Sequence, residues 1–197
     1  MARRNDNSRE EIREMALQAA EAILVEQGIQ QLSARQVAKR IGYAVGTLYL
    51  VFKNLDDLML QINARTLKKL HQHLQASLKP RSKPNKQIHQ MAQAYLEFAR
   101  LYPQLWALLY DRRSNPELEL PASYSHEIQA TFDLLEDLLA KRSGQADKKK
   151  CHLSARVLWG AVHGITVLAL DNKLDIAGDY ETNSLLENLV EHYLAGF

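Results

Sequence analysis

The segment Ser33–Lys53, with the sequence SARQVAKRIGYAVGTLYLVFK, determines the fold that we predict for the first part of this chain. It predicts two short helices joined by a tight turn. The first helix is expected over about residues 33–41, because Ser33 can serve as its N-cap and Gln36 follows three residues later, as in a capping box. Gly42 comes directly after the last apolar residue, where a left-handed residue often ends a helix.

The second helix is expected over about residues 45–52. Leu48 and Phe52 are four residues apart and therefore share its inner face, while the side chains between them can point elsewhere. A helix, a tight turn near a glycine and a second helix are the parts of a DNA-binding helix-turn-helix. The segment therefore predicts a DNA-binding motif.

The charges in this region support the same prediction. No acidic residue lies between Glu26 and Asp56, whereas four basic residues do: Arg35, Lys39, Arg40 and Lys53. A small motif with charges of one sign suits a phosphate backbone. The formal net charge of the whole chain is only +2, so DNA affinity must come from this local patch. A helical hairpin that carries four basic residues on a solvated face is the alternative.

From Gly42 onward the sequence has the pattern G-x-x-x-G-T-L-Y-x-x-F-K-N, formed by Gly42, Gly46, Thr47, Leu48, Tyr49, Phe52, Lys53 and Asn54. This pattern resembles the signature of TetR-type repressors. The upstream frame is similar to that family as well, at Gly28, Leu32, Ser33, Val37, Ala38 and Ile41. The resemblance covers about residues 9–60, and it implies a DNA-binding head at the N-terminus of a ligand-binding, dimeric regulator.

The resemblance places Val45, Gly46, Thr47 and Tyr49 at the DNA, and we add four further candidate DNA-binding residues: Ser33, Arg35, Ala44 and Lys53. Arg35 is the candidate for a bidentate contact with guanine, and Thr47 can offer its methyl group to thymine. Tyr49 and Lys53 would contact phosphates. Each of these residues could instead be a solvated surface residue, and Tyr49 could be a core aromatic.

The sequence departs from the family pattern at three positions. Ala44 replaces the usual polar cap of the recognition helix, Val51 stands where a histidine is common, and Leu55 where a lysine is common. Each departure removes an expected backbone contact, and the recognition helix itself carries no charge. We therefore expect base recognition to depend on thymine methyl groups and on Arg35.

The composition is that of a globular, helical protein. The 197 residues suffice for one or two compact domains, and the apolar and charged fractions of 46% and 24% are ordinary. The chain has eight glycines and five prolines and little strand-like alternation, which favours an all-α fold. Its one cysteine, Cys151, excludes an intramolecular disulfide and suits a reducing cytoplasm, where we expect the protein to act.

Neither a signal peptide nor a membrane span is expected. The N-terminus, MARRNDNSREE, leads into no apolar signal-peptide core. The longest apolar run, Val157–Leu170, is interrupted by His163 and is too short for a span, so we interpret it as a buried helix.

Helical spacing of apolar residues predicts about nine helices, over residues 8–28, 33–41, 45–52, 54–78, 86–102, 103–110, 121–142, 152–173 and 182–194. We place the functional boundary in the fourth of them. Residues 1–54 are expected to form the three-helix DNA-binding head, and residues 55–197 the helical body that binds a ligand and dimerises. This layout is again similar to TetR-type regulators, and the segment Trp159–Gly164 resembles a W-x-x-x-H-G pattern of some members.

Aromatic and methionine side chains of the body are the candidates for an effector site: Met91, Tyr95, Phe98, Trp106, Tyr110, Phe132, Trp159 and His163. A pocket lined in this way would take a largely apolar small molecule, and Tyr95, Tyr110 or His163 would fix its polar end. Such residues can equally form an ordinary core. An effector that binds better when the heads are badly spaced for DNA would release the operator.

A homodimer through the last two helices is expected, because these helices carry more apolar surface than one subunit can cover. Gly160 and Gly164 are four residues apart and allow close helix approach, by analogy with membrane helices. Relief of crowding inside one subunit is the other explanation of these glycines. A two-fold dimer would place two recognition helices about one DNA turn apart, which matches a palindromic operator.

No enzymatic function is predicted. The sequence has no glycine-rich phosphate loop, nucleophile elbow or metal-binding cluster, so we expect no catalytic residue, metal or cofactor. The favoured function is a ligand-responsive transcriptional regulator, most simply a repressor, with double-stranded DNA and a small-molecule effector as partners. A DNA-binding architectural or occlusion protein without an inducer is the main alternative, and an all-helical interaction module is another.

Overall fold

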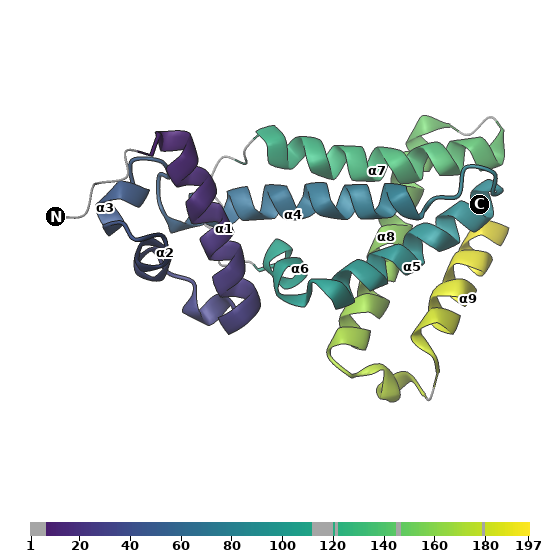
Figure 1. The fold of residues 1–197 in the computed structure, drawn as a ribbon. Coiled ribbons are helices and arrows are strands. Elements are labelled where there is room, and N and C mark those ends of the chain that lie inside the picture. Colours follow the sequence, from purple (N-terminus) through teal and green to yellow (C-terminus); the bar gives the residue numbers. More distant parts are fainter. Residues whose placement is uncertain (1–6, 112–119, 121, 145–146, 179) are drawn as a thin grey trace. The chain divides into compact units, whose positions relative to one another are not determined.

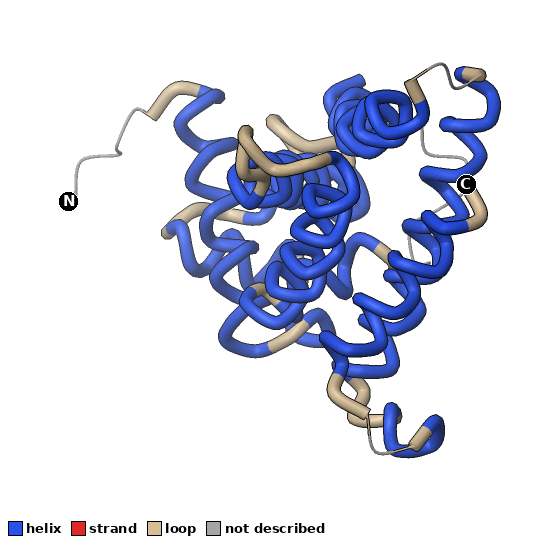
Figure 2. The backbone as a smooth tube through the Cα atoms, turned by 90° about the vertical axis from the view of Figure 1, so that its right-hand side faces the viewer, coloured by secondary structure: helices blue, strands red, loops and turns tan. Residues whose placement is uncertain are grey.

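The computed structural model describes residues 7–111, 120, 122–144, 147–178 and 180–197. Within these ranges the protein consists of nine α-helices, two short 3-10 helices and connecting loops (Figures 1 and 2), which confirms the predicted all-α class. The chain forms two compact units. Unit 1 comprises Met1–Leu67 and Gln104–Ser125, and unit 2 comprises Lys68–Pro103 and His126–Phe197.

Unit 1 contains α1 (Arg9–Gln27), η1 (Ile29–Gln31), α2 (Ala34–Ile41), α3 (Val45–Leu48), the first part of α4 (Leu55–Ser77) and most of α6 (Pro103–Leu109). One apolar core joins these elements. Leu24, Val37 and Leu48 are buried in it together with Leu58 and Ile62 of α4. The start of α4 therefore packs with the head, whereas the functional boundary at residue 54 stays a prediction.

The predicted helix ends of this unit are confirmed where a local cap defines them. Ser8 and Glu11 form a complete capping box at the start of α1. The Oγ of Ser33 accepts the backbone N–H of Gln36 at 3.3 Å, which caps α2. At α4 the Oδ1 of Asn54 accepts the N–H of Asp57 at 2.8 Å. Each cap satisfies backbone donors that the helix itself leaves open.

The predicted second helix is too long at its C-terminal end. Beyond Leu48, the N–H of Leu50 bonds the carbonyl of Thr47 at 3.2 Å, and the N–H of Val51 bonds that of Leu48 at 3.0 Å. This spacing of three residues is that of a tighter 3-10-type turn. The turn brings Val51 and Phe52 into the core of unit 1, and burial of these two side chains explains why it forms.

Unit 2 contains the remainder of α4, α5 (Pro84–Leu101), most of α7 (Ala122–Ser143), α8 (Lys148–Leu170), η2 (Leu174–Ala177) and α9 (Thr182–Ala195). Helices α5, α8 and α9 pack against one another (Figure 1). Helix α8 begins earlier than the predicted residue 152, because the side chain of Asp147 accepts the N–H of Lys149 at 2.9 Å and caps the helix there. Residues 148–151, which lie between the predicted helices 121–142 and 152–173, are therefore helical.

Helix α8 also bears on the question of a membrane span. Among the described residues it is the one helix that is long and apolar enough to cross a bilayer, so the prediction that this stretch is too short for a span is wrong. Core helices of soluble proteins share these properties, so the helix is weak evidence for a span. Only 28% of its most apolar part is buried within the protein, so the prediction of a buried helix is also wrong, and much of the apolar surface of α8 is open.

Candidate functional site

The turn between α2 and α3 has a well-defined geometry. Gly42 has a φ of 76°, in the left-handed region. Its N–H bonds the carbonyl of Lys39 at 3.2 Å, and the N–H of Tyr43 bonds that of Ala38 at 3.0 Å. These two bonds are a Schellman motif, which ends α2 and sets the direction of the chain into α3. The two short helices are therefore held as a helix-turn-helix.

The structure leaves the predicted DNA-contacting residues accessible. Arg35, Ala44, Gly46, Tyr49 and Lys53 are exposed, and Ser33, Val45 and Thr47 are half-buried. Leu48, by contrast, is only 2% exposed and anchors α3 in the core. Tyr49 is 51% exposed, which excludes the alternative that it is a core aromatic.

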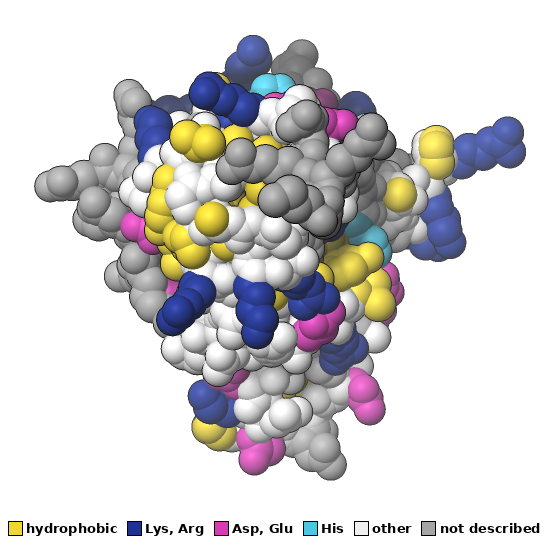
Figure 3. Space-filling view, turned by 60° about the vertical axis from the view of Figure 1, so that its left-hand side comes forward, with side chains coloured by type: hydrophobic (Ala, Val, Ile, Leu, Met, Phe, Trp, Pro, Cys, Tyr) yellow, Lys and Arg dark blue, Asp and Glu magenta, His cyan; other side chains and the backbone are white. Residues whose placement is uncertain are grey.

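One residue of this surface was not predicted. Leu50 is 63% exposed and follows Tyr49 in the turn after α3. Its position in the sequence could have indicated this exposure, because Leu50 does not share the inner face of Leu48 and Phe52. Figure 3 shows a face of the molecule on which exposed hydrophobic side chains stand beside basic ones. An exposed leucine can contact thymine methyl groups in a major groove.

The basic patch has less positive charge available for phosphate than the sequence suggests, because one of its four basic side chains is paired with a carboxylate. Nη1 and Nη2 of Arg40 donate to the two carboxylate oxygens of Glu26 at 2.7 and 2.6 Å. This bidentate pair lowers the pKa of Glu26 and raises the pKa of Arg40, because each charge stabilises the other. Arg35, Lys39 and Lys53 are the other exposed basic side chains of the patch.

A chain of polar contacts braces the end of the motif against α1 and α4. The guanidinium of Arg13 lies 5.4 Å from the ring centroid of Phe52, and its Nη1 donates to Oε1 of Gln61 at 2.8 Å. Nε2 of Gln61 donates to Asp57 Oδ1 at 3.0 Å, and Asp57 Oδ2 accepts the backbone N–H of Lys53 at 2.8 Å. Lys53 is thus fixed through its main chain while its side chain stays exposed.

Four of the predicted effector residues come together in unit 2. Oη of Tyr95 and Nδ1 of His163 are hydrogen-bonded at 2.9 Å. The indole of Trp159 stacks on His163 with ring centroids 5.4 Å apart, and the ring of Phe132 meets Trp159 edge-on at 5.7 Å. Burial lowers the pKa of His163, so its neutral form is favoured. We call these four residues the aromatic cluster.

The other four predicted effector residues are not members of the aromatic cluster. Met91 is buried on α5, the helix that carries Tyr95, and Phe98 on the same helix packs against His73 and Tyr102, with centroid distances of 5.8 and 5.0 Å. Two further residues belong to unit 1, where their rings lie 5.1 Å apart: Trp106 and Tyr110. Unit 2 by itself therefore assembles only part of the predicted set.

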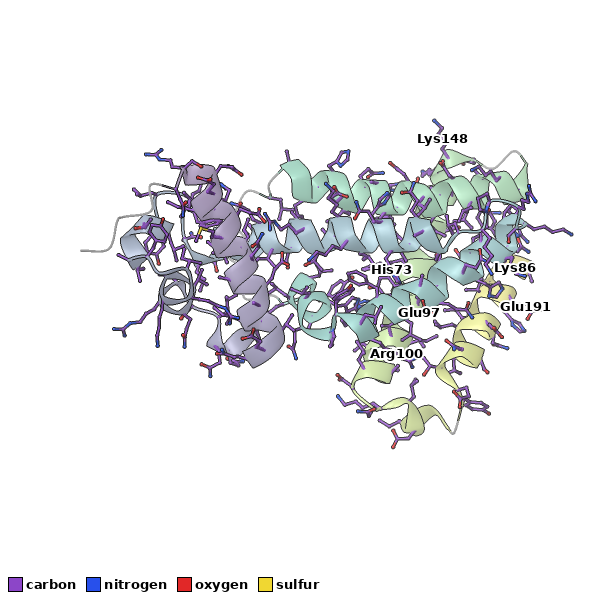
Figure 4. The ribbon with its side chains drawn as sticks, viewed as in Figure 1. His73, Lys86, Glu97, Arg100, Lys148 and Glu191 are labelled. Carbon is purple, nitrogen blue, oxygen red and sulfur yellow. The ribbon has the colours of Figure 1, made fainter. Side chains whose placement is uncertain are left out.

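A groove in unit 2 was not predicted. It has a volume of about 730 Å³ and is formed by the end of α4, the loop after it, α5 and α9. Its wall carries charged side chains of both signs, including Lys86, Glu97 and Glu191, which Figure 4 labels along α5 and α9. No sequence signal indicated it, because its residues come from helices far apart in the chain.

Comparison with known proteins agrees with this geometry. Residues 88–193 match the family model "Tetracyclin repressor-like, C-terminal domain", and residues 16–62 match "Bacterial regulatory proteins, tetR family". The chain is 21% identical over 179 residues to the fatty acid metabolism regulator protein of Bacillus subtilis (strain 168), covering 88% of this chain and 91% of that protein.

Two solved structures share the fold. One is a protein with unknown function from Rhodococcus sp. RHA1, with a TM-score of 0.79 and 21% identity over 100% of this chain and 99% of that one. The other is the transcriptional regulator FadR from Bacillus subtilis in complex with stearoyl-CoA, with a TM-score of 0.69 and 18% identity over 93% and 98% of the two chains.

The match over residues 88–193 covers more than half of the chain, and the match over residues 16–62 covers the helix-turn-helix. The members of the family are DNA-binding transcription factors and not enzymes. The chain therefore belongs to the TetR family of DNA-binding transcriptional regulators.

Proposed function

We propose that the protein is a repressor that binds a palindromic operator as a homodimer and is released by a largely apolar small molecule in its body. The observation that carries the proposal is the surface around α3. Tyr49 and Leu50 are 51% and 63% exposed there, on a segment without an acidic residue. These two large exposed side chains are adjacent, in the turn after a four-residue helix, and a DNA groove can cover both.

Each DNA-facing residue has a role that its chemistry supports. Thr47 and Leu50 offer methyl groups to thymine, and Arg35 offers a bidentate donor to guanine. Tyr49 and Lys53 would bond phosphates and so fix the register of the motif on the duplex. The Ser33 hydroxyl caps α2 through its oxygen, which leaves its proton for a phosphate.

Helix α8 supports the proposed dimer. Leu153, Val157 and Leu168 are exposed on it, and Gly160 and Gly164 lie on the same stripe. A Cβ placed at either glycine meets no described atom of the chain within 4 Å, so crowding inside the subunit does not explain them. A second copy packing against this stripe would cover its apolar side chains and use the space at the glycines.

For the effector we take a long-chain fatty acyl thioester as the first candidate. The similar FadR structure from Bacillus subtilis holds stearoyl-CoA, and the similar Bacillus subtilis protein is named a fatty acid metabolism regulator. The aromatic cluster adds an apolar wall with a hydrogen-bonding pair, Tyr95 and His163, that could fix a polar thioester end. Binding that favours a spacing of the heads unsuited to the operator would then lower DNA affinity.

A DNA-binding experiment tests the first part. Operator sites would be selected from random duplexes and from DNA upstream of the protein's own gene, and affinity measured by fluorescence anisotropy. Arg35→Ala should weaken binding to the selected site by about 1–3 kcal/mol and relax the sequence preference of the protein. Arg81→Ala removes the same charge in the loop after α4 and is the matched control. Equal losses in the two variants would refute base recognition by Arg35.

The effector is tested on the same complex. Stearoyl-CoA should release the labelled operator, coenzyme A alone should not, and Tyr95→Phe should weaken the response. If neither stearoyl-CoA nor free stearate changes operator affinity, the thioester proposal fails. If a broad set of apolar compounds also has no effect, the alternative of a DNA-binding occlusion protein without an inducer is the better description.

A further inference from the structure

Unit 1 contains a cavity close to the helix-turn-helix. Its volume is about 160 Å³, and its wall is mostly apolar. Three segments of unit 1 meet at it, namely the residues around η1, the first turns of α4 and the end of α6. Its apolar lining consists of Ile29, Leu32, Leu55, Met59, Leu60 and Leu108. Leu32 directly precedes Ser33, the cap of α2, so the cavity adjoins the DNA-reading motif.

One polar side chain in this wall has an unused hydrogen-bonding atom. Asn63 lines the cavity and is only 5% exposed. Its Nδ2 donates to the carbonyl of Leu108 at 3.3 Å, but its Oδ1 has no hydrogen-bond partner within the described part of the chain. A buried amide oxygen without a donor is unfavourable, and most such atoms in proteins are satisfied by protein, water or a ligand.

We propose that this cavity binds a compact, mostly apolar molecule with one O–H or N–H donor, which bonds Oδ1 of Asn63. A dry apolar cavity of about 150 Å³ is known to hold a benzene ring, so a phenol-sized molecule fits the volume. Asn63 and Asp111 are the polar residues of the wall, and the other six lining residues are apolar. The apolar part of the space suits an apolar ring better than ordered water, because each water needs two to four polar partners.

This site is separate from the effector site proposed above. The cavity lies in unit 1, whereas the aromatic cluster lies in unit 2. Its volume also excludes a long acyl chain with a coenzyme A head. A molecule in the cavity would touch the residues around η1, α4 and α6 together and would stabilise their packing. Binding in this cavity therefore does not depend on a fatty acyl thioester in unit 2.

The test compares phenol with toluene on the full chain, by isothermal titration calorimetry and by NMR chemical shifts. The two probes have similar rings, but only phenol carries a donor. We expect saturable binding of both, with phenol bound about tenfold more tightly, as one hydrogen bond to a buried acceptor supplies about that factor. Asn63→Leu should abolish this difference and leave toluene binding intact.

Two further variants locate the site. Leu55→Phe replaces an aliphatic side chain of the wall by a bulkier phenyl ring, which should fill the cavity and remove binding of both probes. Arg81→Ala changes an exposed residue in the loop after α4 and should change neither affinity. Asn63→Leu is expected to fold, because the carbonyl of Leu108 keeps the N–H of Asp111 as a donor at 3.3 Å. The phenol–toluene comparison on the unaltered protein does not depend on any variant.

Three outcomes would overturn the proposal. The first is equal affinity for phenol and toluene, which would show that the Asn63 oxygen is not used. The second is an undiminished preference for phenol in Asn63→Leu, which would place the donor contact elsewhere. The third is the absence of saturable binding of either probe, which would mean that the cavity holds solvent only.

Discussion

A methyl group added at Gly160 or Gly164 should have opposite effects in an isolated subunit and in a dimer that packs on this side of α8. Both glycines lie in the interior of α8 and are exposed. In such positions alanine is more favourable than glycine by about 0.5–1 kcal/mol, because glycine loses more backbone entropy on folding. The added Cβ meets no described atom within 4 Å at either site, so the isolated subunit has no clash to offset this gain. The double variant should therefore raise the free energy of unfolding of a monomer by about 1–2 kcal/mol.

In a dimer packed on this stripe the sign reverses. A methyl group inserted into a close helix contact forces the helices apart, and overpacking of this kind costs about 1–3 kcal/mol. Each 1.4 kcal/mol raises a dissociation constant about tenfold. The dimer Kd of Gly160→Ala,Gly164→Ala should therefore rise by about tenfold or more, although α8 itself becomes a better helix.

The assay is sedimentation velocity over a dilution series, combined with thermal unfolding followed by circular dichroism. Ser125→Ala is the control, since it makes a similarly small change at an exposed position of α7. A double variant that dimerises as tightly as the unaltered protein, and unfolds at a higher temperature, would refute the argument that these glycines lie at the subunit interface.

Three other predictions follow from contacts in the two units. Glu26→Gln should release Arg40 for phosphate, raising DNA affinity at low salt and steepening the slope of log K against log salt by about one; an unchanged slope would contradict this. Asp57→Ala removes the acceptor of the Lys53 N–H and should lower the free energy of unfolding in urea by about 1–2 kcal/mol. His163 has a lowered pKa, so the folded state binds fewer protons than the unfolded state, and its contribution to stability should be lost as pH falls below the ordinary value of 6.5; denaturation curves of His163→Asn should lack that part of the pH dependence.

The sequence predicts helices well where short-range chemistry defines them. Ser8, Ser33 and Asn54 each cap the helix that was expected, because a cap needs only residues two or three positions away. Gly42 ends α2 for the same reason. The end of α3 was predicted wrongly, because the tight turn after Leu48 is set by burial in a core that helical spacing alone does not describe.

Contacts between distant residues were not predictable in the same way. Glu26 and Arg40 are fourteen positions apart, and nothing in helical periodicity indicates that they form an ion pair. Apolar stripes likewise predict that Trp106 and Trp159 lie inward, but not that they belong to different compact units. The cavity beside Asn63 arises where three segments meet, so no single stretch of sequence contains it.

The Glu26–Arg40 pair has a consequence for how the protein would find its operator on a chromosome. Glu26 occupies the guanidinium that would otherwise attract any phosphate, and so it acts as a competitor carried on the same chain. Attraction to arbitrary DNA falls with each cation removed, whereas contacts to base edges are unaffected. The protein should therefore dissociate sooner from the many incorrect sites that a genome offers, and the ratio of correct to incorrect occupancy improves at the expense of total affinity.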